Sequence, residues 1–339
     1  MIRYGPGVTN PSTGHRVVVL ANPGAGGRRH RRLLPVVLER LAIAGTSPQV
    51  LPATSAAEAE HACRQAVAEG ATALVAVGGD GTVHAALQAV AGTDVPLAIV
   101  PTGTGNDLAA ALGVPADPVA AAEAVVAGLV AGTTRQVDLA RITPADGDDP
   151  AGEGADRPAR WYGAVLAAGF DAVVNERANR MRWPRGDRRY DLAIFLELVR
   201  LPARRYRIGV DGTWLETDAV LVAVGNTSSY GGGIRICPHA NPTDGLLDVV
   251  VGAAMPRRTL VRLRPAAYRG THVDHPLVSS YRARTVTLAA DGIVGYADGE
   301  RCLPLPITVT CHPGALRLLT RPVTDRERAP VAGAGTADG

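Results

Sequence analysis

Short apolar runs alternate with amphipathic segments over the first 130 residues of this chain. The runs at residues 16–21, 73–77 and 96–100 are rich in Val, Leu, Ile and Ala, which is typical of parallel strands that are covered on both faces. A shorter strand is expected at residues 49–51. Helices are expected at residues 28–44, from a capping box at Thr54 or Ser55 with Glu58 to about Glu69, at residues 83–90 with Thr82 as N-cap, after Asp107, and at residues 119–131 after Asp117–Pro118.

This alternation predicts a doubly wound, mostly parallel α/β sheet over residues 15–134. Strand-like runs dominate from Thr133 onward and predict an antiparallel β domain over residues 135–306. These runs are residues 135–142, 161–168, 205–210, 219–224, 247–251, 285–289, 307–310 and 316–319. Two helical stretches are expected among them, at residues 171–182 and 190–201. The polar, Gly- and Pro-rich segments 1–14, 144–160 and 322–339 are expected to be disordered.

Three glycine-rich loops follow predicted strands, at residues 22–27, 78–82 and 101–107. Glycine lets the backbone approach a ligand, and a helix start favours phosphate oxygens. One such loop alone is better explained as a tight strand-to-helix turn. Three loops at strand ends indicate the edge where open α/β sheets bind ligands. Asp80 lies inside the second loop and would repel phosphate, so the site is predicted to take a nucleotide with Mg.

Composition removes several classes of phosphate enzyme. All 35 basic residues are arginine, since the chain has no lysine. Walker A loops, protein kinases and pyridoxal phosphate enzymes all need a lysine and are therefore excluded. A net charge of +3 and 4% aromatic residues do not call for nucleic acid. The four cysteines lack zinc spacing, and with no signal peptide or long apolar run a cytoplasmic protein is expected.

The loops, taken with two later stretches, resemble the bacterial diacylglycerol kinase and sphingosine kinase-like lipid kinase family, whose nucleotide domain is distantly shared with NAD kinases and phosphofructokinases. The matching stretches are NPGAG (22–26), GGDGT (78–82), PTGTGNDLA (101–109), GGGIRICPHANPTDGLLDV (231–249) and DGE (298–300). The resemblance implies a β-sandwich as the second domain, with residues 307–321 returning to the first. It also implies a nucleotide in the α/β domain and a lipid in a cleft between the two.

Roles follow from the matching motifs. Glu300 resembles the proton acceptor, with Asp298 as the competing candidate, and Asp80 and Asp107 would organise Mg and its waters. Asp244, with backbone carbonyls near Asn241 and Leu246, resembles a structural metal site. The residues implied at the nucleotide are Asn22, Pro23, Gly24, Ala25, Gly26, Thr54, Gly78, Gly79, Asp80, Gly81, Thr82, Val83, His84, Thr104, Asn106 and Asp107.

Two positions depart from the family pattern. Ala25 stands where the family often has Ser, which removes a hydroxyl from the phosphate loop. Ala85 stands where a Glu often follows the second loop, so no role is assigned there. His84 is expected at the helix surface or the edge of the core rather than in the chemistry.

The resemblance implies an ATP-dependent lipid kinase, with diacylglycerol as the leading acceptor. Sphingoid bases, glycolipids and isoprenoid alcohols stay open as acceptors. A soluble NAD kinase-like enzyme and a non-catalytic sensor also stay open, and the intact Asp80, Asp107, Asp298 and Glu300 argue against the sensor. Residues 177–207 carry ten arginines against three acidic residues. They are either a solvated face or a surface for anionic lipid at the inner membrane, and a homodimer is left open.

Overall fold

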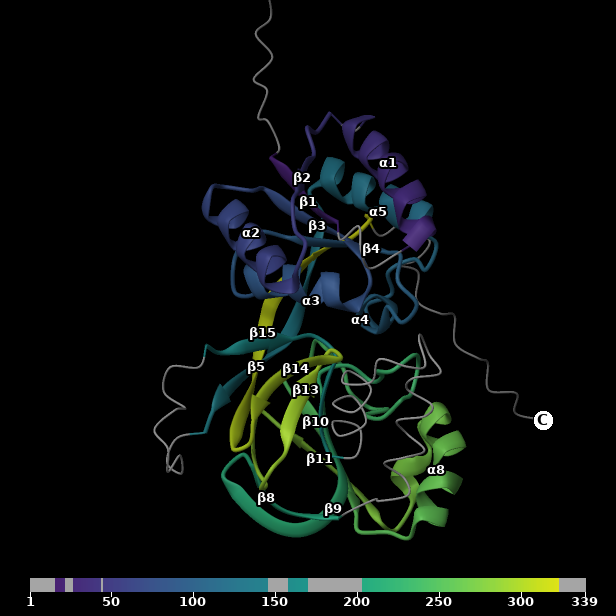
Figure 1. Ribbon diagram of the computed structural model, residues 1–339, viewed down its shortest axis with the longest axis vertical. Helices are drawn as coiled ribbons and strands as arrows, with labels where there is room; N and C mark the ends of the chain where they lie inside the picture. The colour runs from purple at the N-terminus through teal and green to yellow at the C-terminus, as the bar shows by residue number, and fades with distance from the viewer. Residues whose placement is uncertain (1–15, 22–26, 44, 146–157, 170–202, 323–339) are drawn as a thin grey trace, which may run out of the picture.

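The computed structural model describes residues 16–21, 27–43, 45–145, 158–169 and 203–322. The N-terminal half is an α/β layer and the C-terminal half consists mainly of antiparallel strands (Figure 1). Both parts of the predicted fold class are therefore confirmed. The helices are α1 (Gly27–Ile43), α2 (Ala56–Ala68), α3 (Asp80–Val90), α4 (Asp107–Ala111), α5 (Pro118–Ala131), α8 (Arg257–Arg269) and the 3-10 helix η1 (His272–Asp274).

The strands of the first half are β1 (Val17–Ala21), β2 (Gln49–Leu51), β3 (Ala73–Gly78) and β4 (Leu97–Pro101). Those of the second half are β5 (Thr134–Pro144), β6 (Arg160–Tyr162), β7 (Val165–Gly169), β8 (Arg204–Val210), β9 (Thr213–Gly225), β10 (Leu247–Ala253), β11 (Val278–Ala283), β12 (Thr285–Ala289), β13 (Val294–Ala297), β14 (Glu300–Pro304) and β15 (Ile307–Leu319). No helix in the described part of the chain is both long and apolar enough to cross a membrane.

The α/β layer has parallel strands in the order β4-β3-β1-β2. Successive side chains of a strand point to opposite faces, so each strand contributes to two hydrophobic clusters. On one face, α2 and α3 pack through Cys63 and Leu87 against Leu74. On the other face, α1 and α5 pack through Leu41 and Val125 with Val75. The continuous apolar runs in the sequence are explained by this burial on both sides.

The predicted N-caps are right for two helices and wrong for one. Asp117 caps α5 with Pro118 at its first position, as expected. Ser55 caps α2 and accepts the N–H of Glu58 at 3.2 Å, while the Glu58 carboxylate returns to Thr54 rather than to Ser55. Thr82 does not cap α3, which begins at Asp80 with Gly79 as its N-cap. The N–H groups of residues 82 and 83 donate to the Gly79 carbonyl, which places Thr82 within the first turn.

Strand β15 connects the two halves of the molecule. It pairs antiparallel with β5 along nearly its whole length and with β12 in the β layer. Its Leu318 also pairs in parallel with Leu97 of β4. The runs predicted separately at 307–310 and 316–319 are thus one strand, with an irregularity between His312 and Leu316. The domain boundaries stay a prediction, because β5 and β15 run through both halves.

Several elements of the second half were not predicted. They are the basic helix α8, the strand β11 and the hairpin formed by β13 and β14. The hairpin turn consists of Asp298 and Gly299, whose φ angles are +52° and +81°. An Asp-Gly pair with two positive φ angles is the preferred two-residue hairpin turn, so this sequence signal was available. The helices expected at 171–182 and 190–201, and most of the three segments expected to be disordered, lie outside the described residues.

Candidate active site

Three strand ends lie side by side at one edge of the parallel sheet. Ala21 of β1 is in register with Val77 of β3, and Gly78 is in register with Pro101 of β4. The loops after β3 and β4 approach closely, since a Cβ atom on Gly103 would lie 2.6 Å from the Cα of Gly79. Glycine is therefore required here by backbone contact.

Asp80 holds these two loops together. Its Oδ2 accepts the N–H of Asn106 and its Oδ1 accepts the N–H of Asp107, each at 2.8 Å. Burial raises the pKa of the Asp80 carboxyl above its ordinary value, and the charges of Asp107 and Asp298 raise it further, against the effect of the two N–H groups. The ionised carboxylate is therefore held at a cost in the folded protein, which a nearby cation would relieve.

Asp107 connects the nucleotide side to the second half of the chain. Its Oδ1 accepts the N–H groups of Gly232 and Gly233 at 3.0 and 3.2 Å, and its Oδ2 lies 3.1 Å from the N–H of Gly232. Gly231, Gly232 and Gly233 all have positive φ angles, so these glycines give the loop a conformation in which two successive N–H groups face one carboxylate. The structure thus brings together the motifs at 101–109 and 231–249.

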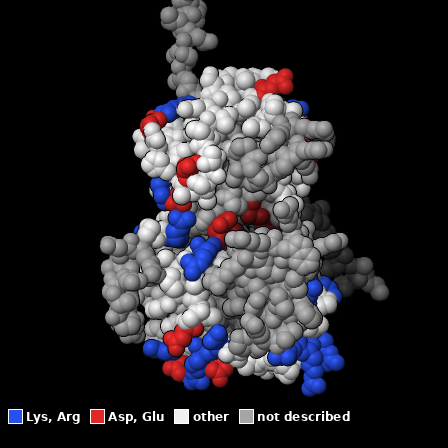
Figure 2. All heavy atoms as spheres, in the orientation of Figure 1, with Lys and Arg blue, Asp and Glu red and all other residues white. Residues whose placement is uncertain are grey.

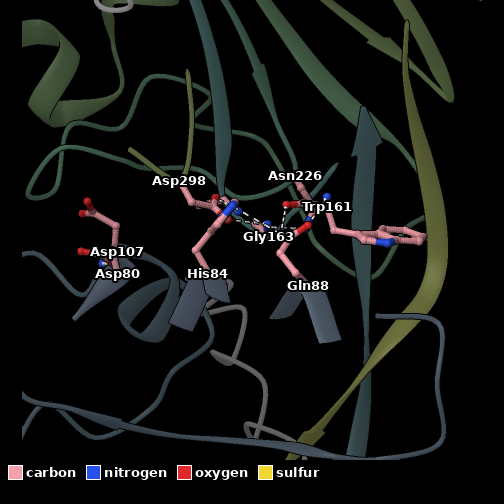
Figure 3. A network of polar contacts seen from close by, with 9 residues as sticks. Asp80, His84, Gln88, Asp107, Trp161, Gly163, Asn226 and Asp298 are labelled. Atoms are coloured by element: carbon pink, nitrogen blue, oxygen red, sulfur yellow. Dashed lines mark hydrogen bonds and ion pairs between the residues drawn. The ribbon is translucent and has the colours of Figure 1, made fainter. Parts of the chain in front are cut away.

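The Asp298 side chain is buried, and both of its oxygens make polar contacts. The side chain is 4% exposed. Its oxygens accept the N–H groups of Gly163 and Ala164 at 3.0 and 2.8 Å, and Oδ2 lies 3.3 Å from Nδ1 of His84 (Figure 3). A carboxylate with three such partners is a positioning group rather than a free base. These contacts favour Glu300 over Asp298 as the proton acceptor.

Helix α3 contributes two further polar side chains that face the second half. His84 and Gln88 both point toward the β layer in Figure 3. Gln88 donates to the carbonyl of Trp161 at 2.6 Å and accepts the N–H of the same residue at 2.9 Å. Asn226 donates to the carbonyls of Asp138 and Gly163, each at 2.8 Å. Sequence reasoning missed Gln88 and Asn226, because their partners are backbone groups far away in the chain.

Glu300 is exposed and begins β14 directly after the Asp298–Gly299 turn. Its Oε1 would lie 2.9 Å from a Cβ atom on Gly81, so the carboxylate reaches the GGDGT turn itself. Figure 2 shows acidic side chains gathered at the waist between the two halves. The residues predicted as the catalytic carboxylate and as the phosphate loop are therefore neighbours, although about 220 positions separate them.

The remaining residues predicted to contact the nucleotide differ in exposure and in their hydrogen bonds. Thr104 is exposed in its loop, and Thr54 donates its hydroxyl to Glu58 at 2.6 Å. Asn106 has a left-handed backbone (φ 57°) and bonds Gly103 through both side-chain atoms. The Val83 side chain packs in the core and is therefore not placed to contact a phosphate. Residues 22–26 lie outside the described residues.

The donor set fits a magnesium ion. Mg²⁺ keeps several waters and is usually held by one or two carboxylates together with substrate phosphates. Asp80 supplies a half-buried carboxylate with a raised pKa, and Asp107 lies beside it (Figure 3). No group of three or more His, Cys, Asp or Glu side chains in the described part of the chain forms a closed metal site. A magnesium ion that arrives with its nucleotide needs no such group.

The donor set at Asp244 fits a metal less well. Its Oδ1 accepts the N–H of Leu246 at 3.0 Å, and its Oδ2 is ion-paired with Arg282. Arg282 also lies 3.5 Å from Asp248, and Asn241 accepts the hydroxyl of Thr243. The guanidinium thus supplies positive charge at the place predicted for a cation. The metal site at Asp244, Asn241 and Leu246 stays a prediction.

Replacing Arg282 tests which cation this loop uses. We expect Arg282→Ala to destabilise the protein by about 1–2 kcal/mol, because the mostly buried Asp248 loses its charged partner. Chelation with EDTA should leave the wild-type melting temperature unchanged. Thermal melts of wild type, Arg282→Ala and the neighbouring Arg284→Ala measure both effects. A lower wild-type melting temperature after chelation would instead support a structural metal at Asp244.

Replacing Gly103 tests the close contact between the loops. We expect Gly103→Ala to weaken ATP binding and to cost about 1–3 kcal/mol of stability, because the added methyl group meets backbone. Gly252→Ala is a matched control, since its Cβ would make ordinary contacts at 3.5 Å. Calorimetry of nucleotide binding and thermal melts provide the measurements. Equal behaviour of the two variants would contradict a steric requirement for glycine at position 103.

Comparison with known proteins agrees with this geometry. Residues 16–142 match the model of the diacylglycerol kinase catalytic domain, and residues 164–320 match that of the YegS C-terminal NAD kinase beta sandwich-like domain. The chain is 43% identical over 314 residues to a diacylglycerol kinase of Mycobacterium tuberculosis, which covers 92% of this chain and 93% of that protein. This chain belongs to the diacylglycerol kinase family. The predicted family resemblance is confirmed.

More distant relatives align with most of this chain. A diacylglycerol kinase of Bacillus subtilis is 24% identical, with 84% of this chain and 89% of that protein covered. The crystal structure of a diacylglycerol kinase from Bacillus anthracis superposes with a TM-score of 0.65 at 20% identity, covering 91% of this chain and 98% of that one. The structural likeness supports the two-part fold of this family member.

Proposed function

We propose that this protein is an ATP-dependent lipid kinase that transfers the γ-phosphoryl group to the hydroxyl of diacylglycerol, forming phosphatidic acid. The observation that carries the proposal is the contact between Glu300 and the GGDGT turn. It places an exposed carboxylate next to the predicted phosphate loop. The relative at 43% identity supports diacylglycerol as the acceptor.

Phosphoryl transfer asks a protein mainly for positioning and for neutralisation of charge. In this proposal, the glycine loops after β1, β3 and β4 bind the phosphates through backbone N–H groups. Glu300 takes the proton of the acceptor hydroxyl as the new P–O bond forms and the bond to ADP breaks. Asp298 holds the hairpin turn and thereby sets the position of Glu300.

A bound Mg²⁺ would neutralise the negative charge of the nucleotide phosphates. Asp80 and Asp107 would hold the ion and its waters from the protein side. Because the chain has no lysine, this charge has to come from the ion, from arginine and from N–H groups. The Oγ1 atom of Thr82 is buried beside Gly78 and has no hydrogen-bond partner among the described residues.

The site would work at the inner surface of the cytoplasmic membrane, where its lipid acceptor lies. The contact with that surface is peripheral in this proposal. The arginine-rich segment 177–207 is one candidate for this surface, and most of it lies outside the described residues.

A lipid panel tests the proposal directly. The protein is incubated with Mg-ATP and, separately, with diacylglycerol, a sphingoid base, an isoprenoid alcohol or NAD. We expect radiolabelled phosphatidic acid as the main product. Turnover of another lipid alcohol would keep the lipid kinase and replace its acceptor. Phosphorylation of NAD without any lipid product would overturn the proposal.

A further inference from the structure

Helix α8 differs from the other long helices of this protein. It spans Arg257–Arg269 and contains five arginines and no acidic residue. None of its residues is buried, although it is 13 residues long. Its inner face, with Leu260, Leu263 and Ala267, is only half-buried against the protein, and a helix of this length is marginal in water unless a face of it packs well. We propose that α8 is a docking element that lies on an anionic membrane surface.

The exposed face of α8 has the layout of an interfacial helix. Residues 257, 261, 264 and 268 follow a spacing that puts them in one stripe along the helix. Val261 and Tyr268 are 53% and 43% exposed within this stripe, between exposed arginines. The adjacent row carries Arg258, Arg262 and Arg269, all exposed. Apolar and arginine side chains thus alternate along this stripe, which suits the headgroup region, where tyrosine and valine enter and guanidinium groups stay at the phosphates.

The arginines of α8 are available for phosphate. In the part of the chain that the structure describes, none of them is ion-paired with an acidic side chain. The arginines of β8 contrast with them: Arg205 lies 2.9 Å from Glu216, and Arg207 stacks on Trp214 at 5.1 Å. The acidic residue nearest to α8 along the chain is Asp274 in η1, and it is exposed. Figure 2 shows basic side chains gathered where Figure 1 places α8.

The last turn of α8 is connected to the active site. The N–H of Arg235 donates to the carbonyl of Ala267 at 3.0 Å. Arg235 directly follows the loop whose Gly232 and Gly233 donate to Asp107. A membrane held at α8 is therefore held at a defined place relative to the candidate site. The inference rests on the proposed function, because a kinase for a membrane lipid has to reach the bilayer surface.

Flotation with vesicles that lack diacylglycerol tests the docking separately from catalysis. Full-length protein is mixed with vesicles of phosphatidylglycerol and phosphatidylcholine, or of phosphatidylcholine alone. We expect binding to the anionic vesicles that weakens as salt is added. A triple variant with Arg258→Ser, Arg262→Ser and Arg269→Ser should lower this binding roughly a hundredfold, since each basic residue contributes about fivefold. Val261→Ser with Tyr268→Ser should also lower it.

A charge-matched control removes three arginines elsewhere. The side chains of Arg40, Arg64 and Arg317 are 39%, 51% and 43% exposed, and each is ion-paired with an acidic residue. Their replacement by Ser should leave vesicle binding within about twofold of wild type. Equal loss in this control, or normal binding by the α8 variants, would overturn the docking role.

Kinase assays with diacylglycerol in nonionic detergent micelles separate the two proposals. The α8 variants should keep wild-type turnover there, because no anionic surface is present. Absence of turnover in wild-type protein would reject the lipid kinase and leave the vesicle result to decide the role of α8. Loss of turnover in the α8 variants, with unchanged thermal melts, would mean that α8 belongs to the catalytic machinery and would overturn the docking role.

Discussion

Glu300→Gln should lower kcat by about 10²–10⁴-fold, the usual contribution of a positioned general base. The amide keeps the size of the side chain but does not take up the proton of the acceptor hydroxyl. Glu300 is exposed, so its replacement should leave the melting temperature and the affinity for ATP close to wild type. Initial rates with diacylglycerol, calorimetry with ATP and thermal melts measure these three quantities.

The control for this variant is Glu123→Gln, a change at a side chain that is 57% exposed in α5. It should have wild-type rates. Asp298→Asn provides the contrasting arm. Because Asp298 is buried and accepts three polar contacts, its replacement should lower stability and turnover together. An unchanged rate for Glu300→Gln would transfer the role of base to another residue.

Asp80→Asn should abolish most activity, on the order of 10²–10³-fold, while changing the stability of the free protein little. The activity falls because the carboxylate that faces the predicted Mg-nucleotide is lost. The stability is kept because two effects oppose each other. Asparagine retains one of the two hydrogen bonds to the loop at Asn106–Asp107, and it removes a half-buried charge on a carboxyl whose pKa is raised by partial burial.

The raised pKa of Asp80 predicts a direction with pH. A carboxyl whose pKa is higher in the folded state favours folding below the ordinary value of 3.8 and loses that contribution as the pH rises through its folded pKa. Wild-type protein without nucleotide should therefore lose stability relative to Asp80→Asn as the pH rises from about 4 to 7. Mg-ATP should restore the wild type selectively.

Melts over this pH range, with and without Mg-ATP, measure the difference. Asp94→Asn is the control, since its side chain is 89% exposed. It should show neither the loss of activity nor the pH trend. A wild-type protein that gains stability over Asp80→Asn with rising pH would contradict a raised pKa at Asp80.

Local signals in the sequence were sufficient for much of the first half. The apolar runs at β1, β3 and β4 and the caps at Ser55 and Asp117 depend on neighbours within a few positions. The N-cap of α3 was predicted wrongly because Thr82 is a good cap by type. Gly79, three positions earlier, occupies the N-cap position instead, and Gly103 of the loop after β4 lies close to it. Helix α8 was not predicted, because its apolar positions are only half-buried and stand among five arginines and Pro265.

The sequence by itself determined the α/β order, the glycine loops at strand ends and, through the absence of lysine, the kind of phosphate chemistry to expect. Only the tertiary structure decided which carboxylate faces the GGDGT turn and which one has its oxygens occupied by hydrogen bonds. Asp298 and Glu300 are two positions apart and look equivalent as side chains. Burial against the N–H groups of Gly163 and Ala164 engages Asp298, whereas exposure beside Gly81 leaves Glu300 available. That difference comes from contacts between residues far apart in the chain, which no local pattern encodes.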